Sequence, residues 1–131
     1  MKNLLFVLLL VPMVSCVQSK NDFKNSGDLK SDLGDNKGAI EDYSKAIELD
    51  PNYWNAYNNR ANSKILLKDY NGAIADFTKT IELNPDFTSA YLDRGSSKEQ
   101  LGDLNGACDD WKKAASLGDA DADEWVRKKC N

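Results

Sequence analysis

The sequence predicts an all-α solenoid of three stacked helix pairs, closed by a C-terminal capping helix. Three observations predict it. A block of 34 residues occurs three times in succession, apolar residues within each block recur at helical spacing, and the last segment carries one apolar stripe between acidic and basic ends. At 131 residues the chain has the length of one domain, and a hydrophobic fraction of 41% is sufficient for a core.

The repeats occupy residues 20–53, 54–87 and 88–121. Shifting the chain by 34 residues aligns the segment that begins at Asp35 with those that begin at Asp69 and Asp103. Such regular agreement is not produced by chance, so each copy is one structural unit. Six columns are identical in all copies: Lys30, Lys64 and Lys98; Asp35, Asp69 and Asp103; Gly38, Gly72 and Gly106; Ala39, Ala73 and Ala107; Asp42, Asp76 and Asp110; and Lys45, Lys79 and Lys113.

Each copy is expected to form two helices joined by a short turn. In the second copy, Asp69 lies at the turn, where its side chain can cap the following helix. Pro51 and Pro85 follow the second helices, where a missing amide and a fixed φ stop helical propagation. The buried stripes at helical spacing are Tyr57, Ala61 and Leu67 in the first helix and Ala73, Ile74, Phe77 and Ile81 in the second.

Residues 120–131 are expected to form the capping helix, because a solenoid cannot leave its last apolar face bare. Ala122, Trp125 and Val126 form its apolar stripe. Acidic residues occupy the first turn and the basic residues 127–129 the last, which complements the helix dipole at both ends. Because this structural cause is sufficient, the basic cluster is not interpreted as a nucleic-acid or membrane patch.

The copies resemble the tetratricopeptide repeat family over about residues 20–121. The family's columns of aromatic, small, small, aromatic and proline residues fall on Tyr57, Ala61, Ala73, Phe77 and Pro85. The resemblance implies a right-handed superhelical solenoid whose first helices line a concave groove that binds peptide segments. The other copies supply Phe23, Gly27, Ala39, Tyr43 and Pro51, and Tyr91, Gly95, Ala107 and Trp111.

Three columns depart from the family's pattern. Serine or arginine replaces the usual leucine, lysine replaces a tyrosine, and Asp119 occupies the place of the third proline. We expect the arginines or the lysines to pair with the recurrent aspartates across helices. The alternative is separate solvated charges, and exposed pairs contribute only ~0–1 kcal/mol. The residues concerned are Ser26, Arg60 and Arg94; Lys30, Lys64 and Lys98; and Asp42, Asp76 and Asp110.

The N-terminus, residues 1–15, is predicted to be a signal peptide of the bacterial lipoprotein type. Lys2 precedes an apolar run from Leu4 to Val14, which is too short to span a bilayer as a helix. The run ends at Ser15 and Cys16, which resembles a lipobox and implies lipidation of Cys16, although methionine occupies position 13, where leucine is commonest. An ordinary cleaved secretory signal and an uncleaved anchor are the alternatives. Each places the folded part outside the cytoplasm, with residues 16–19 as a linker.

Cys108 and Cys130 then remain as an even pair, in a compartment where disulfides persist. With a turn near Gly118, the two cysteines reach similar heights on antiparallel helices at ~1.5 Å per residue. A disulfide is therefore predicted, and it would contribute on the order of 3 kcal/mol. Two separate buried thiols and a labile redox pair are the alternatives, and the second lacks a CxxC motif.

The predicted partner-binding groove is lined by one stripe of each first helix. In the central copy this stripe holds four asparagines, whose amides can donate to and accept from an extended peptide backbone. Asparagine is a mediocre helix former, which favours a binding role; the alternative is codon bias, since the chain has 13 Asn, and 14 Lys against 3 Arg. The stripe comprises Asn55, Asn58, Asn59, Asn62, Ile65 and Leu66, with Asn21, Lys24, Asn25, Asp28, Ser31 and Asp32 in the first copy and Ser89, Leu92, Asp93, Ser96, Glu99 and Gln100 in the third.

This lining argues against one use of the fold in the resembled family. Chaperone-binding members grip a C-terminal carboxylate with lysine, arginine and asparagine side chains. Lys24 and Asn59 occupy two such positions, but Asp28, Ser89 and Asp93 occupy the others. Two acids at these positions would repel a carboxylate.

Ile65 and Leu66 offer a small apolar centre in the groove, unless they pack on neighbouring helices. With polar flanks on both sides, this centre suits an amphipathic or extended apolar ligand with basic character. The partner is therefore expected to be another protein or a peptide segment.

Composition bears on the function classes. The chain has no histidine, which removes the commonest metal ligand and general base and every Ser-His or Cys-His pair. No inward-facing carboxylate pair is expected, so no enzyme, cofactor or metal site is predicted. The net charge is −4, or −5 once Lys2 is lost with residues 1–15, and it excludes a basic nucleic-acid binder.

The predicted function is a non-enzymatic scaffold, lipid-anchored on the periplasmic or outer-membrane face of a bacterial cell envelope, with the anchor as its one contact with the membrane. A structural subunit that uses its convex face or end cap is one alternative. A periplasmic enzyme or redox protein is another, and the chain could also be secreted or free in the periplasm.

Overall fold

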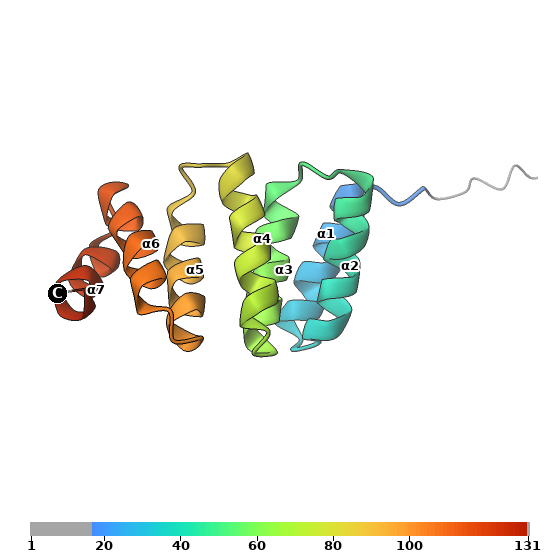
Figure 1. Ribbon diagram of the computed structural model, residues 1–131. Helices are drawn as coiled ribbons and strands as arrows, with labels where there is room; N and C mark the ends of the chain where they lie inside the picture. Colours follow the sequence, from blue (N-terminus) through green and yellow to red (C-terminus); the bar gives the residue numbers. More distant parts are fainter. Residues whose placement is uncertain (1–16, 131) are drawn as a thin grey trace, which may run out of the picture.

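The computed structural model describes residues 17–130, which form seven α-helices and no strand (Figure 1). The all-α class predicted from the sequence is thereby confirmed. Helices α1, α3 and α5 are the first helices of three pairs, and α2, α4 and α6 are the second helices. The bounds are α1 (Lys20–Asp32), α2 (Asn36–Leu49), α3 (Trp54–Leu66), α4 (Tyr70–Leu83), α5 (Thr88–Gln100), α6 (Leu104–Ser116) and α7 (Ala120–Lys129).

The helix pairs lie side by side in one row (Figure 1). Each first helix packs on its own second helix, and each second helix also packs on the next helix of the chain. Helix α7 packs on α6 and closes the row at the end opposite α1. Because each element contacts mainly its neighbours in sequence, the arrangement is a solenoid with a capping helix, as predicted.

One recurring turn joins the helices within each pair. Asp69 is the N-cap of α4, and its Oδ1 accepts a hydrogen bond from the Gly72 amide at 3.0 Å, which confirms the predicted cap. Asp35 and Asp103 cap α2 and α6 in the same way, each at 2.9 Å. The residue before each aspartate has a positive φ, namely 81° at Gly34, 61° at Lys68 and 82° at Gly102.

The same kind of turn, rather than a proline turn, joins α6 to α7. Helices α2 and α4 end at Leu49 and Leu83, and their C-caps, Asp50 and Asn84, immediately precede Pro51 and Pro85. After α6, by contrast, Gly118 has a φ of 99°, and the side chain of Asp119 accepts from the Ala122 amide at 2.8 Å. The missing third proline is thus explained, because Asp119 is the N-cap of α7.

Small residues on the first helices make room for buried aromatic rings on the second helices. A Cβ added to Gly27 would lie 2.6 Å from the Tyr43 ring, and one added to Gly95 would lie 2.6 Å from Trp111 Nε1. In the middle pair, the smaller ring of Phe77 packs in one cluster with Ala61. The size of the first-helix residue therefore matches the ring that it faces.

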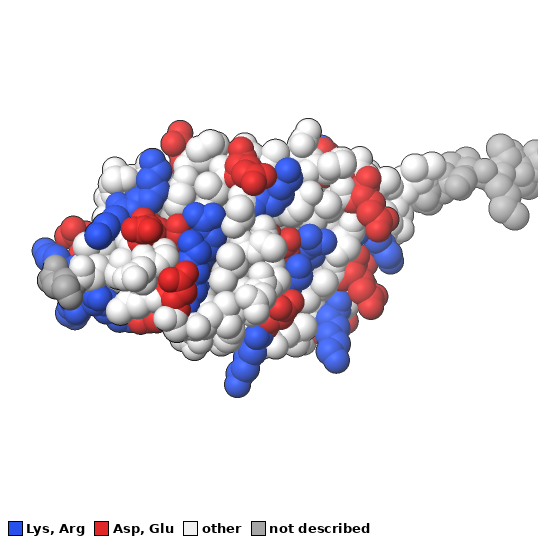
Figure 2. Space-filling model, viewed as in Figure 1, with Lys and Arg blue, Asp and Glu red and all other residues white. Residues whose placement is uncertain are grey.

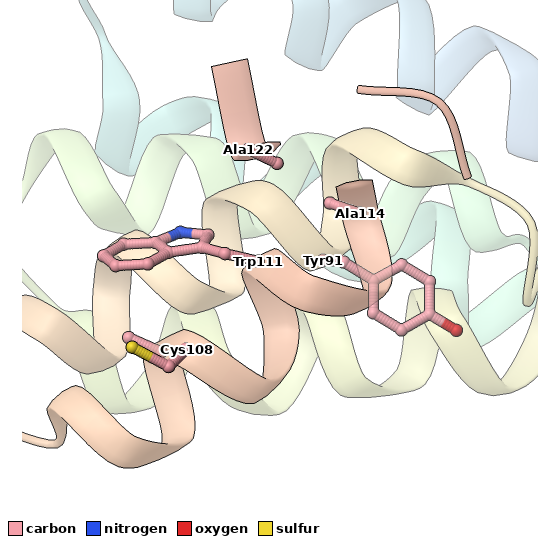
Figure 3. Packing of buried hydrophobic residues seen from close by; sticks show 6 residues of the cluster. Tyr91, Cys108, Trp111, Ala114 and Ala122 are labelled. Carbon is pink, nitrogen blue, oxygen red and sulfur yellow. The ribbon is translucent and has the colours of Figure 1, made fainter. Parts of the chain in front are cut away.

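The C-terminal end of the row is closed by an apolar cluster around Trp111 (Figure 3). Trp111 is fully buried, and Trp125 of α7 meets it edge-on with ring centroids 5.4 Å apart. Ala122 and Val126 also pack there, so the predicted apolar stripe of the capping helix is the face that it buries.

The predicted signal peptide and the lipidation residue Cys16 lie outside the described residues. Within residues 17–130, no helix combines the length and the apolar character needed to cross a bilayer.

Candidate functional site

Buried aspartates fix the first helices against the second helices. Asp76 is 4% exposed, and its carboxylate receives Arg60 Nε at 2.8 Å, Arg60 Nη2 at 2.7 Å and Lys64 Nζ at 2.8 Å. Asp110 is held in the same way by Arg94 and Lys98. The predicted cross-helix pairing is confirmed, and both the arginine and the lysine take part.

The arginines also connect neighbouring pairs. Arg60 Nη1 donates to Ser44 Oγ of the preceding pair at 3.0 Å, and Arg94 Nη1 donates to Thr78 Oγ1 at 3.1 Å. No helix pair precedes the first pair within residues 17–130, and serine replaces arginine there: Ser26 Oγ donates to Asp42 at 2.6 Å. These arginine bonds therefore join each first helix to the second helix of the preceding pair.

Lys30 completes the set around Asp42, with its Nζ 2.7 Å from the carboxylate. Burial acts to raise the pKa of Asp42, but the hydrogen bonds from Lys30 and Ser26 outweigh it. The pKa of Asp42 therefore lies below its ordinary value, and the carboxylate is charged at neutral pH.

A polar hollow of about 380 Å³ lies between α1 and α3, and we call it the first hollow. Three of its lining residues carry carboxylate or phenol groups and three carry amide or hydroxyl groups, so it offers both donors and acceptors. It is lined by Asp28, Ser31, Asp32, Tyr43, Asn59 and Asn62.

Asp28 is the central group of the first hollow. It accepts hydrogen bonds from Lys24 Nζ at 2.6 Å, Tyr43 Oη at 2.9 Å and Asn59 Nδ2 at 2.9 Å. Partial burial acts to raise the pKa of Asp28, but these bonds outweigh it and the pKa lies below the ordinary value. Burial and the neighbouring carboxylate raise the pKa of Tyr43, so its hydroxyl remains a proton donor.

A second hollow of about 240 Å³ lies one repeat further along, between α3 and α5. Ile65 lines it and also packs against the Phe77 cluster, so the alternative that Ile65 packs on neighbouring helices applies to part of its surface. Leu66, which follows Ile65 in the chain, is 64% exposed. The second hollow is lined by Ile65, Tyr70, Ser96, Ser97 and Gln100.

Comparison with protein families finds the same kind of repeat in two overlapping parts of the chain. Residues 27–68 match a model described as TPR repeat, and residues 54–87 match the tetratricopeptide repeat model. The fold is a tetratricopeptide repeat (TPR) solenoid. TPR domains are protein-protein interaction modules, and the groove between the first helices is the surface that carries both hollows. A comparison with curated protein sequences gave no match.

Several solved TPR structures are similar to the chain. The first TPR of Spaghetti (RPAP3), solved with the HSP90 peptide SRMEEVD, is 28% identical with a TM-score of 0.80, over 86% of this chain and 91% of that one. The second TPR domain of human RPAP3, in complex with the HSP70 peptide SGPTIEEVD, is 28% identical with a TM-score of 0.77, over 83% and 92%. The Arabidopsis OM64 TPR domain is 26% identical with a TM-score of 0.78, over 84% and 95%.

The predicted groove residues differ in how far they reach the TPR surface. Asn62 and Leu66 are exposed, whereas Asn59 is engaged by Asp28. Asn58 is 9% exposed, and its buried Oδ1 has no hydrogen-bond partner. Leu92 packs against the Trp111 cluster. Among the others, Asn21, Asn25, Asp32, Ser89 and Gln100 are exposed, and Lys24, Asp28, Ser31, Asn55, Asp93, Ser96 and Glu99 are half-buried.

Two tyrosines line the TPR groove without having been predicted there. Tyr43 belongs to the core aromatic column, but its hydroxyl reaches the first hollow. Tyr70 is the first residue of α4 and lines the second hollow. Both come from second helices, so the stripe of the first helices gives no signal for them.

Outside the groove, Cys108 and Cys130 meet where α7 packs on α6. Their Sγ atoms are 2.06 Å apart and their Cα atoms 5.7 Å apart, which fits the predicted disulfide. Formation of this bond in the protein remains a prediction. Within residues 17–130, no group of three His, Cys, Asp or Glu side chains is placed to hold a metal ion.

Proposed function

We propose that this TPR protein is a non-enzymatic scaffold that binds a segment of a partner protein in the groove of α1, α3 and α5. The observation that carries the proposal is the groove itself: two consecutive hollows, one polar and one lined in part by Ile65, on a fold whose solved relatives include peptide complexes. Protein segments bind such grooves through main-chain hydrogen bonds and side-chain pockets.

The contacts of the groove residues indicate which of them shape the groove and which are available to a ligand. Asn59 is held by Asp28, so it shapes the first hollow. Asn62 is exposed at the same hollow, where its amide is free to pair with a peptide backbone. Leu66 offers apolar surface nearby, and its burial by a ligand is favourable at ~25 cal/mol per Å².

We further propose that the protein is a lipoprotein of the bacterial cell envelope, tethered through Cys16. The support is the sequence of the N-terminus: Lys2, the apolar run to Val14, and Ser15 before the cysteine. Helix α1 begins at Lys20, with Ser19 as its N-cap. Only residues 17–19 would then separate the lipid from the fold, about 10 Å of extended chain, so the first repeat would lie next to the membrane.

The groove assignment is tested with a partner identified by co-purification from envelope fractions. The variant Asn59→Ala/Asn62→Ala/Leu66→Ala should lose most of the recovered partner, because it removes amides and the apolar centre together. The control variant Leu49→Ala/Asn71→Ala makes similar exposed changes on α2 and α4 and should recover the partner normally. Unchanged recovery with the groove variant would overturn the assignment.

The lipid proposal has its own test. Mass spectrometry of the mature N-terminus should show an acylated Cys16, and Cys16→Ser should release the protein from membranes. An unmodified N-terminus at another residue would refute the proposal.

One observation favours contact outside the groove. Leu33, Leu67 and Leu101 follow the ends of the three first helices and are 76%, 42% and 47% exposed, so they form a repeating apolar edge at the turns. The prediction that Leu67 belongs to a buried stripe is wrong, because α3 ends one residue before it. A structural subunit could use this edge. In that case Leu33→Ser/Leu67→Ser/Leu101→Ser, and not the groove variant, should abolish partner recovery.

A further inference from the structure

The three first helices hold no unpaired cation. Each of their lysines and arginines has a carboxylate within ion-pair distance inside the protein, and Asp76 and Asp110 each hold two of these cations. Figure 2 shows acidic and basic side chains intermixed over the face of the molecule in view. The pairs are Lys20 with Asp50, Lys24 with Asp28, Lys30 with Asp42, Arg60 and Lys64 with Asp76, and Arg94 and Lys98 with Asp110.

Two carboxylates of the same helices have no such partner among the described residues. Asp32 of α1 lines the first hollow and is exposed. Asp93 of α5 occupies the same repeat position as Asn59 of α3, in the groove stripe. The other acidic residues of the first helices each have a partner. Asp22 bonds to Ser19 in the capping box, Asp28 pairs with Lys24, and Glu99 pairs with Lys129. At the first hollow, Asp28 and Asp32 carry two negative charges against the single positive charge of Lys24, so the charge there is negative.

Asp93 is half-buried, and burial alone raises its pKa. A carboxylate that is partly desolvated without a cation is unfavourable for the isolated protein. A positively charged group brought by a ligand would remove this penalty.

Apolar surface lies next to this negative charge. Ile65 lines the second hollow, and the next residue of α3, Leu66, is 64% exposed. Neighbouring packed helices are on the order of 10 Å apart, so the two hollows are separated by about three residues of extended chain at ~3.3 Å each.

We propose that the groove takes an extended segment in which a lysine or arginine enters the first hollow beside Asp32 and an apolar residue, about three positions away, packs at Ile65 and Leu66. This inference rests on the proposed function, and it names the chemistry of the partner. The segment carries further basic residues toward Asp93. An acidic segment such as those ending in EEVD, bound by the RPAP3 structures, meets like charge here and is disfavoured.

The test measures binding of short fluorescent peptides to the mature protein by anisotropy. One peptide carries lysine and leucine about three positions apart in a neutral serine-glycine background; the second replaces lysine with glutamate, and the third replaces leucine with serine. We expect the lysine-leucine peptide to bind at least roughly tenfold more tightly than either of the others, and more weakly as salt is raised.

Charge-reversed variants locate the binding. Asp32→Lys/Asp93→Lys should weaken the lysine-leucine peptide about tenfold and strengthen the glutamate peptide. The matched control Glu41→Lys/Glu48→Lys changes the net charge equally on exposed positions of α2 and should leave both affinities within about twofold.

Three results would overturn the inference: tight binding of the glutamate peptide to the wild type, equal effects of the two charge-reversed variants, or no binding of the lysine-leucine peptide. These outcomes are separable from failure of the proposed function. If the groove variant Asn59→Ala/Asn62→Ala/Leu66→Ala still loses the co-purified partner, the groove is a binding site but its partner is not basic.

Discussion

Asp76 is a carboxylate almost removed from water, yet three nitrogens of Arg60 and Lys64 surround it at 2.7 to 2.8 Å. An ion pair of this kind is costly to bury, but it is more costly to break, because the remaining charges lose their partner without regaining full solvation. Among single-residue changes, we therefore expect substitution of one of these buried aspartates to lower the stability of the protein most.

The first prediction concerns that carboxylate. Asp76→Ala should lower the free energy of unfolding by about 3 kcal/mol, because it leaves two part-buried cations unpaired. Urea denaturation measures the change. The control Glu82→Ala removes an exposed partner of Lys79 and should cost about 0.5 kcal/mol or less. Equal losses in the two variants would contradict a special role for the buried pair.

The second prediction uses two carboxyl groups with opposite pKa shifts. Burial raises the pKa of Asp93, so its charge opposes folding at neutral pH, and Asp93→Asn should raise the melting temperature there. Below the ordinary pKa of about 3.9 both folded and unfolded chains bind the proton, and the gain should disappear.

Asp42 is the counterpart, since its pKa lies below the ordinary value once the bonds from Lys30 and Ser26 have outweighed burial. Its contribution to stability is present above the ordinary pKa and is lost as pH falls through the folded pKa. Asp42→Asn should therefore lower the melting temperature at neutral pH. Thermal unfolding of both variants across the acid range checks the signs, and shifts of the same sign would be contrary to expectation.

At the scale of elements, the helices are set by short local signals that recur in every pair. An aspartate caps each second helix, and a glycine three residues later leaves space for it: a Cβ on Gly72 would lie 2.2 Å from Asp69 Oδ2. Helix α7 has an alanine at this place, and there the N-cap Asp119 has a ψ of 117° instead of the 72° found at Asp69. The cap and the glycine therefore act as one unit.

The third prediction follows from that contact. Gly72→Ala should destabilise the protein by about 1 kcal/mol, although alanine is the better helix former by a similar amount, because the added methyl displaces the cap. In an Asp69→Ala background the same change should be neutral or stabilising. A double-mutant cycle by chemical denaturation measures the coupling, and additive effects would exclude it.

At the scale of the whole molecule, each helix pair of a solenoid is stabilised only by contacts within the pair and with its immediate neighbours. The end helix α7 has one packed face, so it depends on the Trp111 cluster and on the closeness of Cys108 to Cys130. A crosslink there would close a segment with a sequence separation of 22 and hold the end of the row in place.

The fourth prediction is that the crosslink forms and acts locally. A non-reduced peptide map should show a fragment linking Cys108 and Cys130 that separates on reduction. Cys108→Ser/Cys130→Ser should lower stability by about 3 kcal/mol. Hydrogen exchange should then rise in α6 and α7, and much less in α1 to α4. Equal loss of protection along the row would contradict local action.

Much of the fold could be predicted because its signals are local and repeated. The caps at Asp35, Asp69 and Asp103 and the apolar stripe of the last helix each depend on residues within one or two helical turns, and the 34-residue period repeats such local signals three times. The pairing of the arginines with aspartates is not local, but it was predictable because each pair recurs at the same spacing of 16 residues.

The sequence by itself determined the repeat, the helix pairs and the stripe that lines the groove, because helical periodicity assigns a face to each residue. Only the tertiary structure decided which stripe residues remain available. It turned Asn58 inward, engaged Asn59 with Asp28, brought Tyr43 and Tyr70 into the hollows, and left Asp32 and Asp93 without a cation. The physical reason is that the availability of a groove side chain to a ligand depends on how the neighbouring helices pack, and the sequence of one helical stripe does not specify that packing.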